Sequence, residues 1–90
     1  MSMKKVVQVQ VVEGEGLAAL LNQRITLFCT RYIYTGRLVG INDDCVLLED
    51  AAIVYETGPL SDKKWSMVEA LPGPWYVQLQ SIESFGVLKQ

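Results

Sequence analysis

The stretch "GRLVGINDDCVLLED", residues 36–50, predicts a strand, a tight turn and a second strand. Its "NDD" centre favours the turn because Asn and Asp bond their own backbone and tolerate left-handed geometry. Aliphatic and β-branched residues continue the first strand back to Ile33 and the second strand forward to Glu56. The chain therefore contains a long hairpin, with strands expected over 33–41 and 45–56.

Gly36 and Gly40 lie four residues apart in the first of these strands, so they share one face of it. Glycine weakens a strand interior and usually marks a sharp bend or a close approach by another backbone. A small barrel needs one long strand that bends to serve both halves of its sheet. We expect residues 33–41 to form that central strand. The alternative is that one of the glycines only relieves crowding.

The segments outside the hairpin predict one all-β domain over residues 1–90. The three elements expected before the hairpin are a strand in an N-terminal extension over 1–14, a short helix over 16–23, and a strand over 24–30. Residues 57–74 contain all three prolines and predict a long loop or an extended hairpin arm. Two last strands are expected over 75–80 and 84–88. Such a chain buries its apolar face by curling one sheet into a small five-stranded barrel.

Composition and charge exclude several partners. The ten acidic residues outnumber the eight basic ones, so the chain has no general attraction to nucleic acid or to an anionic membrane. No apolar run approaches the roughly 18–20 residues that span a bilayer. Gln8 and Gln10 interrupt the Val-rich start, which makes it a poor signal peptide. We expect Cys29 and Cys45 to be reduced, buried cysteines of a cytoplasmic protein, with a disulfide as the alternative.

The residue types needed for catalysis are sparse. The chain has no histidine, which removes the imidazole base and the His-ligated metal site. It also lacks a CxxC pair, a phosphate-cradling glycine loop and a nucleophile elbow. Asp43 and Asp44 are neighbours in a turn, where carboxylates are usually solvated and do not share a proton. We expect no enzyme activity, no metal and no small-molecule cofactor.

The hairpin and its surroundings resemble the Sm-like family, which comprises the Sm, LSm and bacterial Hfq proteins. The first motif of the family runs from a basic residue at the start of a strand, through a Gly-x-Leu-x-Gly strand and an Asp/Asn turn, to an apolar strand. The matching residues here are Arg24, Gly36, Leu38, Gly40, Ile41, Asn42, Val46, Leu47 and Leu48. From Gly36 to Leu48 the spacing is ungapped against the Hfq branch. "VQLQSIESFGV", residues 77–87, is similar to the second motif, with Ile82 as the buried residue of its corner.

The resemblance implies an SH3-like five-stranded open barrel with a short N-terminal helix, here with an extra N-terminal strand, assembled into a closed ring. The fold-critical residues would be Gly36, Leu38, Gly40 and Ile82. An independent argument for assembly is that no proline, lysine or inward charge blunts the strand edge over 75–82. Head-to-tail pairing of such edges closes a ring of about five to seven copies if the rotation allows it. The alternative is a monomer whose edge is covered by the N-terminal strand.

Apolar side chains of the last two strands are the expected subunit contacts in such a ring. They are Trp75, Val77, Leu79, Phe85 and Val87.

In Sm-like rings, the turn after the second strand and the corner before the last strand line a pore that binds RNA bases. The matching residues here are Asn42, Asp43 and Asp44 in the turn and Gln80 and Ser81 in the corner. Asn42 and Gln80 carry amides able to hydrogen-bond a base.

The turn departs from its relatives in charge. Asp44 stands where Hfq-like proteins carry an aromatic, and Gln78, Leu79 and Gln80 replace a Tyr-Lys-His run. Two aspartates beside a phosphate would repel it by about 1–4 kcal/mol. Repeated around a ring, the turn predicts an acidic collar.

A second RNA surface is expected on the face of the ring. Its candidates are Arg31 and Tyr32 in the first turn, Arg37 nearby in sequence, and Lys63 and Lys64 next to Trp65 in the long loop. Arg and Tyr side by side in a loop are able to clamp a base. The alternatives are an ordinary turn with one packed ring, and a solvated loop with one aromatic resting on the barrel.

The sequence thus predicts a ring-forming Sm-like protein with a role in binding or chaperoning single-stranded RNA. One alternative is a homo-oligomeric ring used for protein assembly that has lost RNA binding. Another is an SH3-like monomer that binds a peptide through its aromatics. In the first two readings the chain's main partner is itself, and no membrane is involved.

Overall fold

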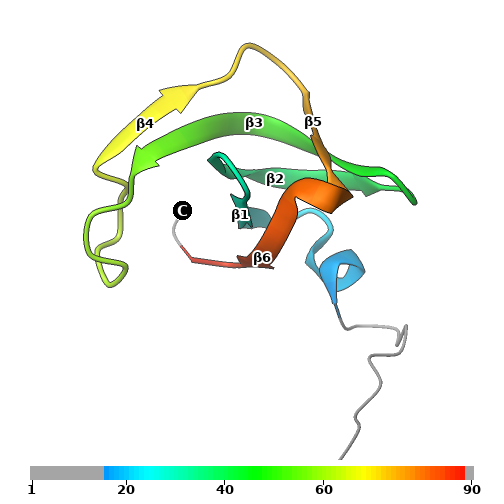
Figure 1. Cartoon of the computed structure of the whole chain (residues 1–90), viewed down its shortest axis with the longest axis horizontal. Coiled ribbons are helices and arrows are strands. Elements are labelled where there is room, and N and C mark those ends of the chain that lie inside the picture. The colour runs from blue at the N-terminus through cyan, green and yellow to red at the C-terminus, as the bar shows by residue number, and fades with distance from the viewer. Residues whose placement is uncertain (1–15, 89–90) are drawn as a thin grey trace, which may run out of the picture.

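The computed structural model describes residues 16–88 and shows an antiparallel six-stranded sheet that does not close into a barrel (Figure 1). The strands are β1 (Arg24–Cys29), β2 (Ile33–Ile41), β3 (Cys45–Glu56), β4 (Met67–Ala70), β5 (Trp75–Gln78) and β6 (Ile82–Gly86). Two short 3₁₀ helices complete it, η1 (Leu17–Leu20) and η2 (Leu79–Ser81). The predicted all-β class is confirmed. The strand expected within residues 1–14 lies outside the described residues.

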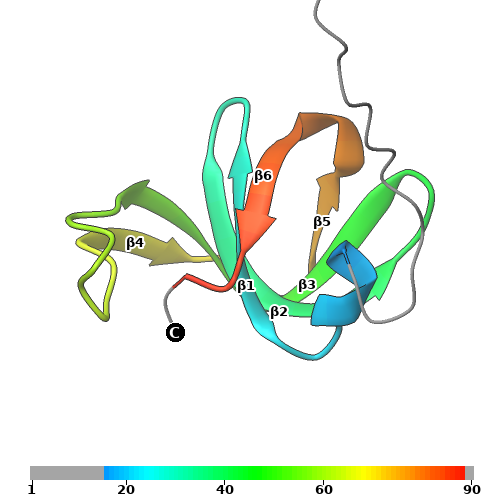
Figure 2. The same cartoon turned by 90° about the horizontal axis from the view of Figure 1, so that it is seen from below.

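The long strand β3 pairs with three other strands of the sheet. The strand order is β4-β3-β2-β1-β6, and β5 also pairs with β3. β3 pairs with β2 along one side, and on its other side its two halves pair with β5 and β4 in turn. Figure 2 shows the result: β5 runs along β3, and β6 runs along β1. Among the described residues, β5 and β6 therefore each have one unpaired edge.

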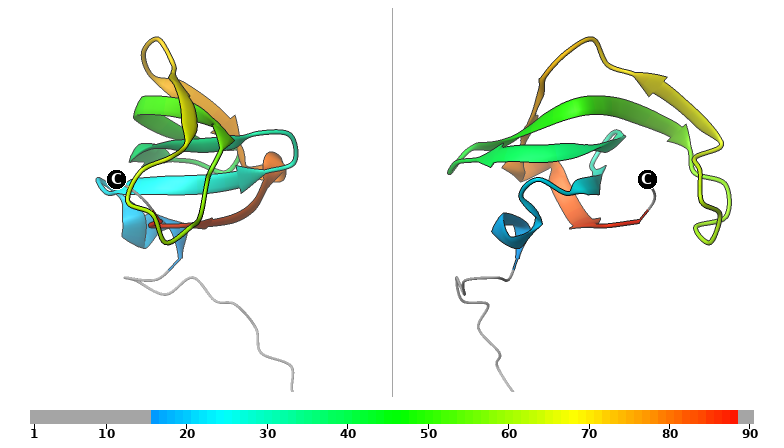
Figure 3. Two further views of the ribbon diagram at one scale, coloured as in Figure 1. Left: turned by 90° about the vertical axis from the view of Figure 1, so that its left-hand side faces the viewer. Right: turned by 180° about the vertical axis from the view of Figure 1, so that it is seen from behind.

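Two bulges bend the central hairpin. Thr35 pairs with Ala52 and Arg37 with Glu49, so two β3 residues stand opposite Gly36 alone. One of these two, Asp50, takes up the extra length with a left-handed φ of 51°. A second register shift follows Leu38 on β2. Because bulges bend and twist a strand pair, β3 arches over β2, as Figure 3 shows from behind.

Of the two glycines in β2, only Gly36 is required by a close contact. A Cβ at Gly36 would lie 3.1 Å from the Ala51 Cα, which is backbone, and 3.1 Å from the Leu48 Cβ. A Cβ at Gly40 would meet nothing nearer than the Leu47 Cβ at 3.6 Å, an ordinary van der Waals distance. Gly36 thus permits the close packing of β2 on β3, whereas the surroundings of Gly40 have room for a methyl group.

The hydrophobic core lies in the concave side formed by β1, β2, β5 and the first half of β3. Its buried members are Ile25, Leu27, Cys29, Leu38, Val46, Leu48, Ala51 and Val77. The partly buried side chains packed on them are Leu17, Leu20, Tyr34, Leu71, Trp75, Leu79 and Ile82. The core includes Leu38 and Ile82, two of the residues expected to be critical for the fold.

Three of the five expected subunit contacts also contact this core. Val77 lies opposite Val46 and is only 5% exposed, so its side chain faces the interior of its own chain. Trp75 and Leu79 are partly buried and pack on the same cluster. Phe85 and Val87, by contrast, are 42% and 51% exposed.

The helix expected over 16–23 is shorter than predicted. Gly16 and Asn22, with φ of 75° and 70°, bracket the four residues of η1. Leu17 and Leu20 pack on the core as the periodicity indicates, but Leu21 is exposed. The Asn22 N–H donates to the Leu38 carbonyl at 2.6 Å, and the Leu38 N–H donates to Gln23 at 2.9 Å. These bonds fasten the segment to β2.

Residues 57–74 contain a strand that the sequence left open between a loop and a hairpin arm. β4 pairs with the second half of β3, for example Ala52 with Ala70 and Val54 with Val68. All four residues of β4 are exposed, so no alternation marks it in the sequence. The last strand also begins earlier than predicted, at Ile82, directly after η2. In residues 16–88 no helix is long and apolar enough to cross a bilayer.

Candidate nucleic-acid interface

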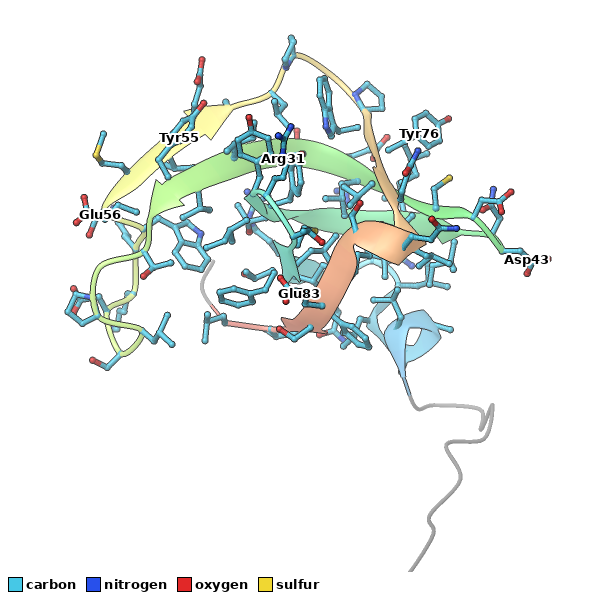
Figure 4. All side chains as sticks on the ribbon, in the orientation of Figure 1. Arg31, Asp43, Tyr55, Glu56, Tyr76 and Glu83 are labelled. Carbon is cyan, nitrogen blue, oxygen red and sulfur yellow. The ribbon has the colours of Figure 1, made fainter. Side chains whose placement is uncertain are left out.

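The turn between β2 and β3 is held by Asn42. Its side-chain oxygen Oδ1 accepts hydrogen bonds from the backbone N–H groups of Asp44 and Cys45, at 2.7 and 2.8 Å. The Asn42 N–H in turn donates to the Cys45 carbonyl at 3.0 Å. The acceptor that was predicted to read a base is therefore used to shape the turn. Asp43 and Asp44 are exposed, and Asp43 stands at the far end of the hairpin in Figure 4.

The turn and the corner meet, as expected from the resemblance. The Leu79 N–H, at the start of η2, donates to the Asp44 carbonyl at 2.9 Å. A surface depression of about 470 Å³ opens between them, which we call the turn–corner depression. It is lined by Asp43, Asp44, Cys45, Tyr76, Gln78, Leu79 and Gln80. Of the predicted pore residues it includes Asp43, Asp44 and Gln80 but neither Asn42 nor Ser81.

Tyr76 is the residue that the sequence reasoning missed. Tyr76 lies on β5, opposite Leu47 of β3, and is 67% exposed. It lines both the turn–corner depression and a smaller depression that includes Asn42. Figure 4 shows its ring on the outer side of β5. The aromatic absent from the turn is thus supplied by a neighbouring strand. The alternation over 75–80 puts Tyr76 on the other face of the strand from Trp75 and Val77, but the sequence does not indicate which residues lie beside Tyr76.

The turn–corner depression is acidic. Asp43 and Asp44 are among its lining residues, and no lysine or arginine is. Its remaining polar side chains are the neutral amides of Gln78 and Gln80 and the phenol of Tyr76. The site therefore has an aromatic surface and groups for hydrogen bonding, but no charge that attracts phosphate.

Ser81 ties the corner to the first turn. Its carbonyl accepts the Thr30 N–H at 2.9 Å and the Thr30 hydroxyl at 3.4 Å. Arg31 and Tyr32 follow Thr30 in this turn and are both exposed. The Tyr32 ring meets Tyr34 edge-on, with centroids 6.2 Å apart. Ser81 itself acts through its backbone.

The other residues expected on the face do not join this turn. Arg37, on β2, forms an ion pair with Glu49 across the hairpin, so its charge is compensated. Lys63 and Lys64 lie in the loop between β3 and β4, where Lys64 lines a different depression together with Arg24 and Trp65. The candidate residues for the face therefore lie on three separate elements.

No disulfide joins the two cysteines of the described chain, Cys29 and Cys45. Cys29 is buried in the core, and Cys45 is half-buried beside the turn–corner depression. Burial, assisted by the negative charge of Glu83, raises the pKa of the Cys29 thiol from 9.0 to about 11. Near neutral pH this lowers its thiolate fraction by about 100-fold, since each pKa unit is a factor of ten.

We expect a thiol reagent such as DTNB to modify Cys45 faster than Cys29 at pH 8, because the thiolate is the reactive form and Cys29 is both buried and protonated. The absorbance of the released dye, recorded over time, should give a progress curve with two phases, and each phase gives the rate of one thiol. The Cys45→Ser variant should retain only the slow phase, and urea should make that phase fast. A fast reaction of folded Cys45→Ser would contradict the buried placement of Cys29.

No protein-family model matches this chain, and no curated protein sequence matches it. Within residues 16–88, no group of three or more His, Cys, Asp or Glu side chains is arranged to hold a metal ion. The case for a function accordingly rests on the chain's own residues and geometry.

Proposed function

We propose that this chain is a binding protein without enzymatic activity, an Sm-like subunit that assembles into a homo-oligomeric ring and binds single-stranded RNA. The observation that carries the proposal is the contact between the β2–β3 turn and η2, which places exposed Tyr76 beside Gln78 and Gln80. Stacking on an exposed ring and hydrogen bonding to base edges are two of the means by which proteins hold single-stranded RNA.

The unpaired edges of β5 and β6 support assembly. Each strand has one hydrogen-bonded neighbour in residues 16–88, β3 for β5 and β1 for β6. Pairing β6 of one copy with β5 of the next would be a heterologous contact, and such contacts form a ring when their rotation closes. Since η2 joins these two strands, assembly through them would bring the turn–corner depressions of all copies round one axis.

The carboxylates suggest which bases such a site prefers. Asp43 and Asp44 accept hydrogen bonds only, so they complement the amino groups of adenine, cytosine and guanine. Uracil offers only its ring N3–H, a single donor, and no amino group. We therefore expect A-rich or mixed RNA to bind better than U-rich RNA. The two aspartates repel the RNA phosphates, and salt partly screens this repulsion.

The same carboxylates favour the second candidate function, a ring for protein assembly that does not bind RNA. Its specific support is that the lining of the turn–corner depression includes two aspartates and no cation. This reading shares the ring with the first and differs only at the depression.

A gel-shift comparison of wild type and Tyr76→Ala separates the two candidates. We expect Tyr76→Ala to weaken RNA binding about 5- to 150-fold, because stacking one base contributes about 1–3 kcal/mol. Short U-rich, A-rich and mixed strands should be compared at low and moderate salt. Tyr55→Ala is the matched control, since Tyr55 is also an exposed tyrosine, at 56%, but lies on β3 outside the depression.

Two results would count against RNA binding at this site. If no strand shifts at low salt, the assembly ring becomes the better description. If Tyr55→Ala weakens binding as much as Tyr76→Ala does, the RNA contacts another surface.

A further inference from the structure

The sheet has a second concave side, distinct from the hydrophobic core. Four fully or nearly buried residues, Thr26, Thr35, Ala52 and Val54, are not members of the core cluster. Three of them form a row with Ala70, because Thr26 pairs with Thr35, Thr35 with Ala52, and Ala52 with Ala70. The bulge at Gly36 makes this possible by shifting the register of β3, so that its second half presents Ala52 and Val54 to this side.

Small side chains in this row leave a depression of about 430 Å³. Thr35, Ala52, Val68 and Ala70 line it from the strands, and Arg24, Lys64 and Trp65 complete it. We call it the Arg24–Trp65 depression. Its volume is within the range of about 300–1,000 Å³ found for small-molecule sites. It shares no lining residue with the turn–corner depression.

The charge of this depression is opposite to that of the turn–corner depression. Two cations, Arg24 and Lys64, line it, and no carboxylate does. Arg24 lies opposite Arg37 in the register, but Glu49 forms an ion pair with Arg37 and not with Arg24. Among residues 16–88 Arg24 has no ion-pair partner. In a protein with net charge −2, an uncompensated guanidinium in a depression is a site for an anion.

We propose that the Arg24–Trp65 depression binds a nucleotide, either free or as part of an RNA strand. The indole of Trp65 and the apolar surface of Ala52, Val68 and Ala70 suit a flat base. The Arg24 guanidinium suits its phosphate, since guanidinium groups bind phosphate through paired hydrogen bonds. An aliphatic anion would make no use of the indole, and a neutral nucleoside would make no use of the guanidinium. This site does not depend on the function proposed above.

Tryptophan fluorescence tests the site directly, because the chain has only two tryptophans. The full chain should be titrated with 5′-AMP, adenosine and inorganic phosphate at low salt. We expect 5′-AMP to quench the emission and to bind at least about tenfold more tightly than adenosine or phosphate. Adenosine can only stack its base, and inorganic phosphate can only bind the guanidinium. The Trp65→Phe variant should lose the quenching, and Trp75→Phe should keep it.

Two arginines on neighbouring strands provide the matched pair of variants. Arg24→Gln should weaken 5′-AMP binding about tenfold or more, and Arg37→Gln, which removes an equal charge outside the depression, should change it less than about twofold. Circular dichroism melts show whether each variant is folded. Equal weakening by both variants would mean a general charge effect and would overturn the proposal.

A short RNA strand, titrated in parallel, identifies the source of the nucleotide. If 5′-AMP quenches, the site takes a free nucleotide; if only the strand quenches and Arg24→Gln weakens it, the site belongs to RNA. No quenching by either ligand would overturn the proposal. The gel shift of Tyr76→Ala reports on the turn–corner depression, so failure at one site is distinguishable from failure at the other.

Discussion

Replacing Gly36 by alanine is expected to lower the free energy of unfolding by about 2–3 kcal/mol, and Gly36→Val is expected to leave little folded protein. The added Cβ would lie 3.1 Å from the Ala51 Cα and 3.1 Å from the Leu48 Cβ. The first of these is backbone in the bulge of β3, so it cannot turn aside as a long side chain would. Overpacking of this kind typically costs about 1–3 kcal/mol for small additions and more for branched ones.

Gly40→Ala in the same strand is the control, since its nearest neighbour would be the Leu47 Cβ at 3.6 Å. We expect a change within about 1 kcal/mol, partly offset by the lower backbone entropy of unfolded alanine. Urea denaturation at one fixed protein concentration measures both variants. Equal destabilisation at the two positions would show that the close approach to Ala51 is not the reason for glycine at position 36.

The hairpin was predictable residue by residue because its signals are local. The strands expected over 33–41 and 45–56 have those bounds in the structure, since β-branched runs and the Asn-Asp-Asp turn specify them without help from distant residues. The strand expected over 24–30 ends one residue earlier, at Cys29. The role of Asn42 was less predictable: one amide has the chemistry both to cap a turn and to read a base, and the hydrogen bonds decide for the turn.

The facing of strands was harder to predict. Alternation has a period of two, so it separates the faces of a strand without saying which one is inside. Val77 is therefore expected at a subunit contact from its pattern although it is buried in the core, and the same pattern does not single out Tyr76 at the candidate site. The sequence does not predict β4 as a separate strand, because all four of its residues are exposed and show no alternation. Its pairing depends on the length of β3, whose second half it lies along.

Lysines in β6 and directly after it are expected to convert the proposed ring into a monomer. Phe85 and Val87 are exposed in the single chain, so Phe85→Lys with Val87→Lys should leave its fold intact. Lysine on a strand edge opposes edge-to-edge pairing, because association would bury its charge. Light scattering should give about five to seven times 10.1 kDa for wild type and 10.1 kDa for the double variant.

Tyr55→Lys is the control for this result, because Tyr55 is an exposed apolar residue of β3 that is on neither β5 nor β6. It should keep the mass of the wild type, and its hydroxyl bond to Glu69 should be its main loss. A wild-type mass of 10.1 kDa would remove the ring altogether. A double lysine variant that keeps the oligomeric mass would instead place the subunit contact elsewhere. The other unpaired strand edges of residues 16–88 are the outer edges of β4 and β5.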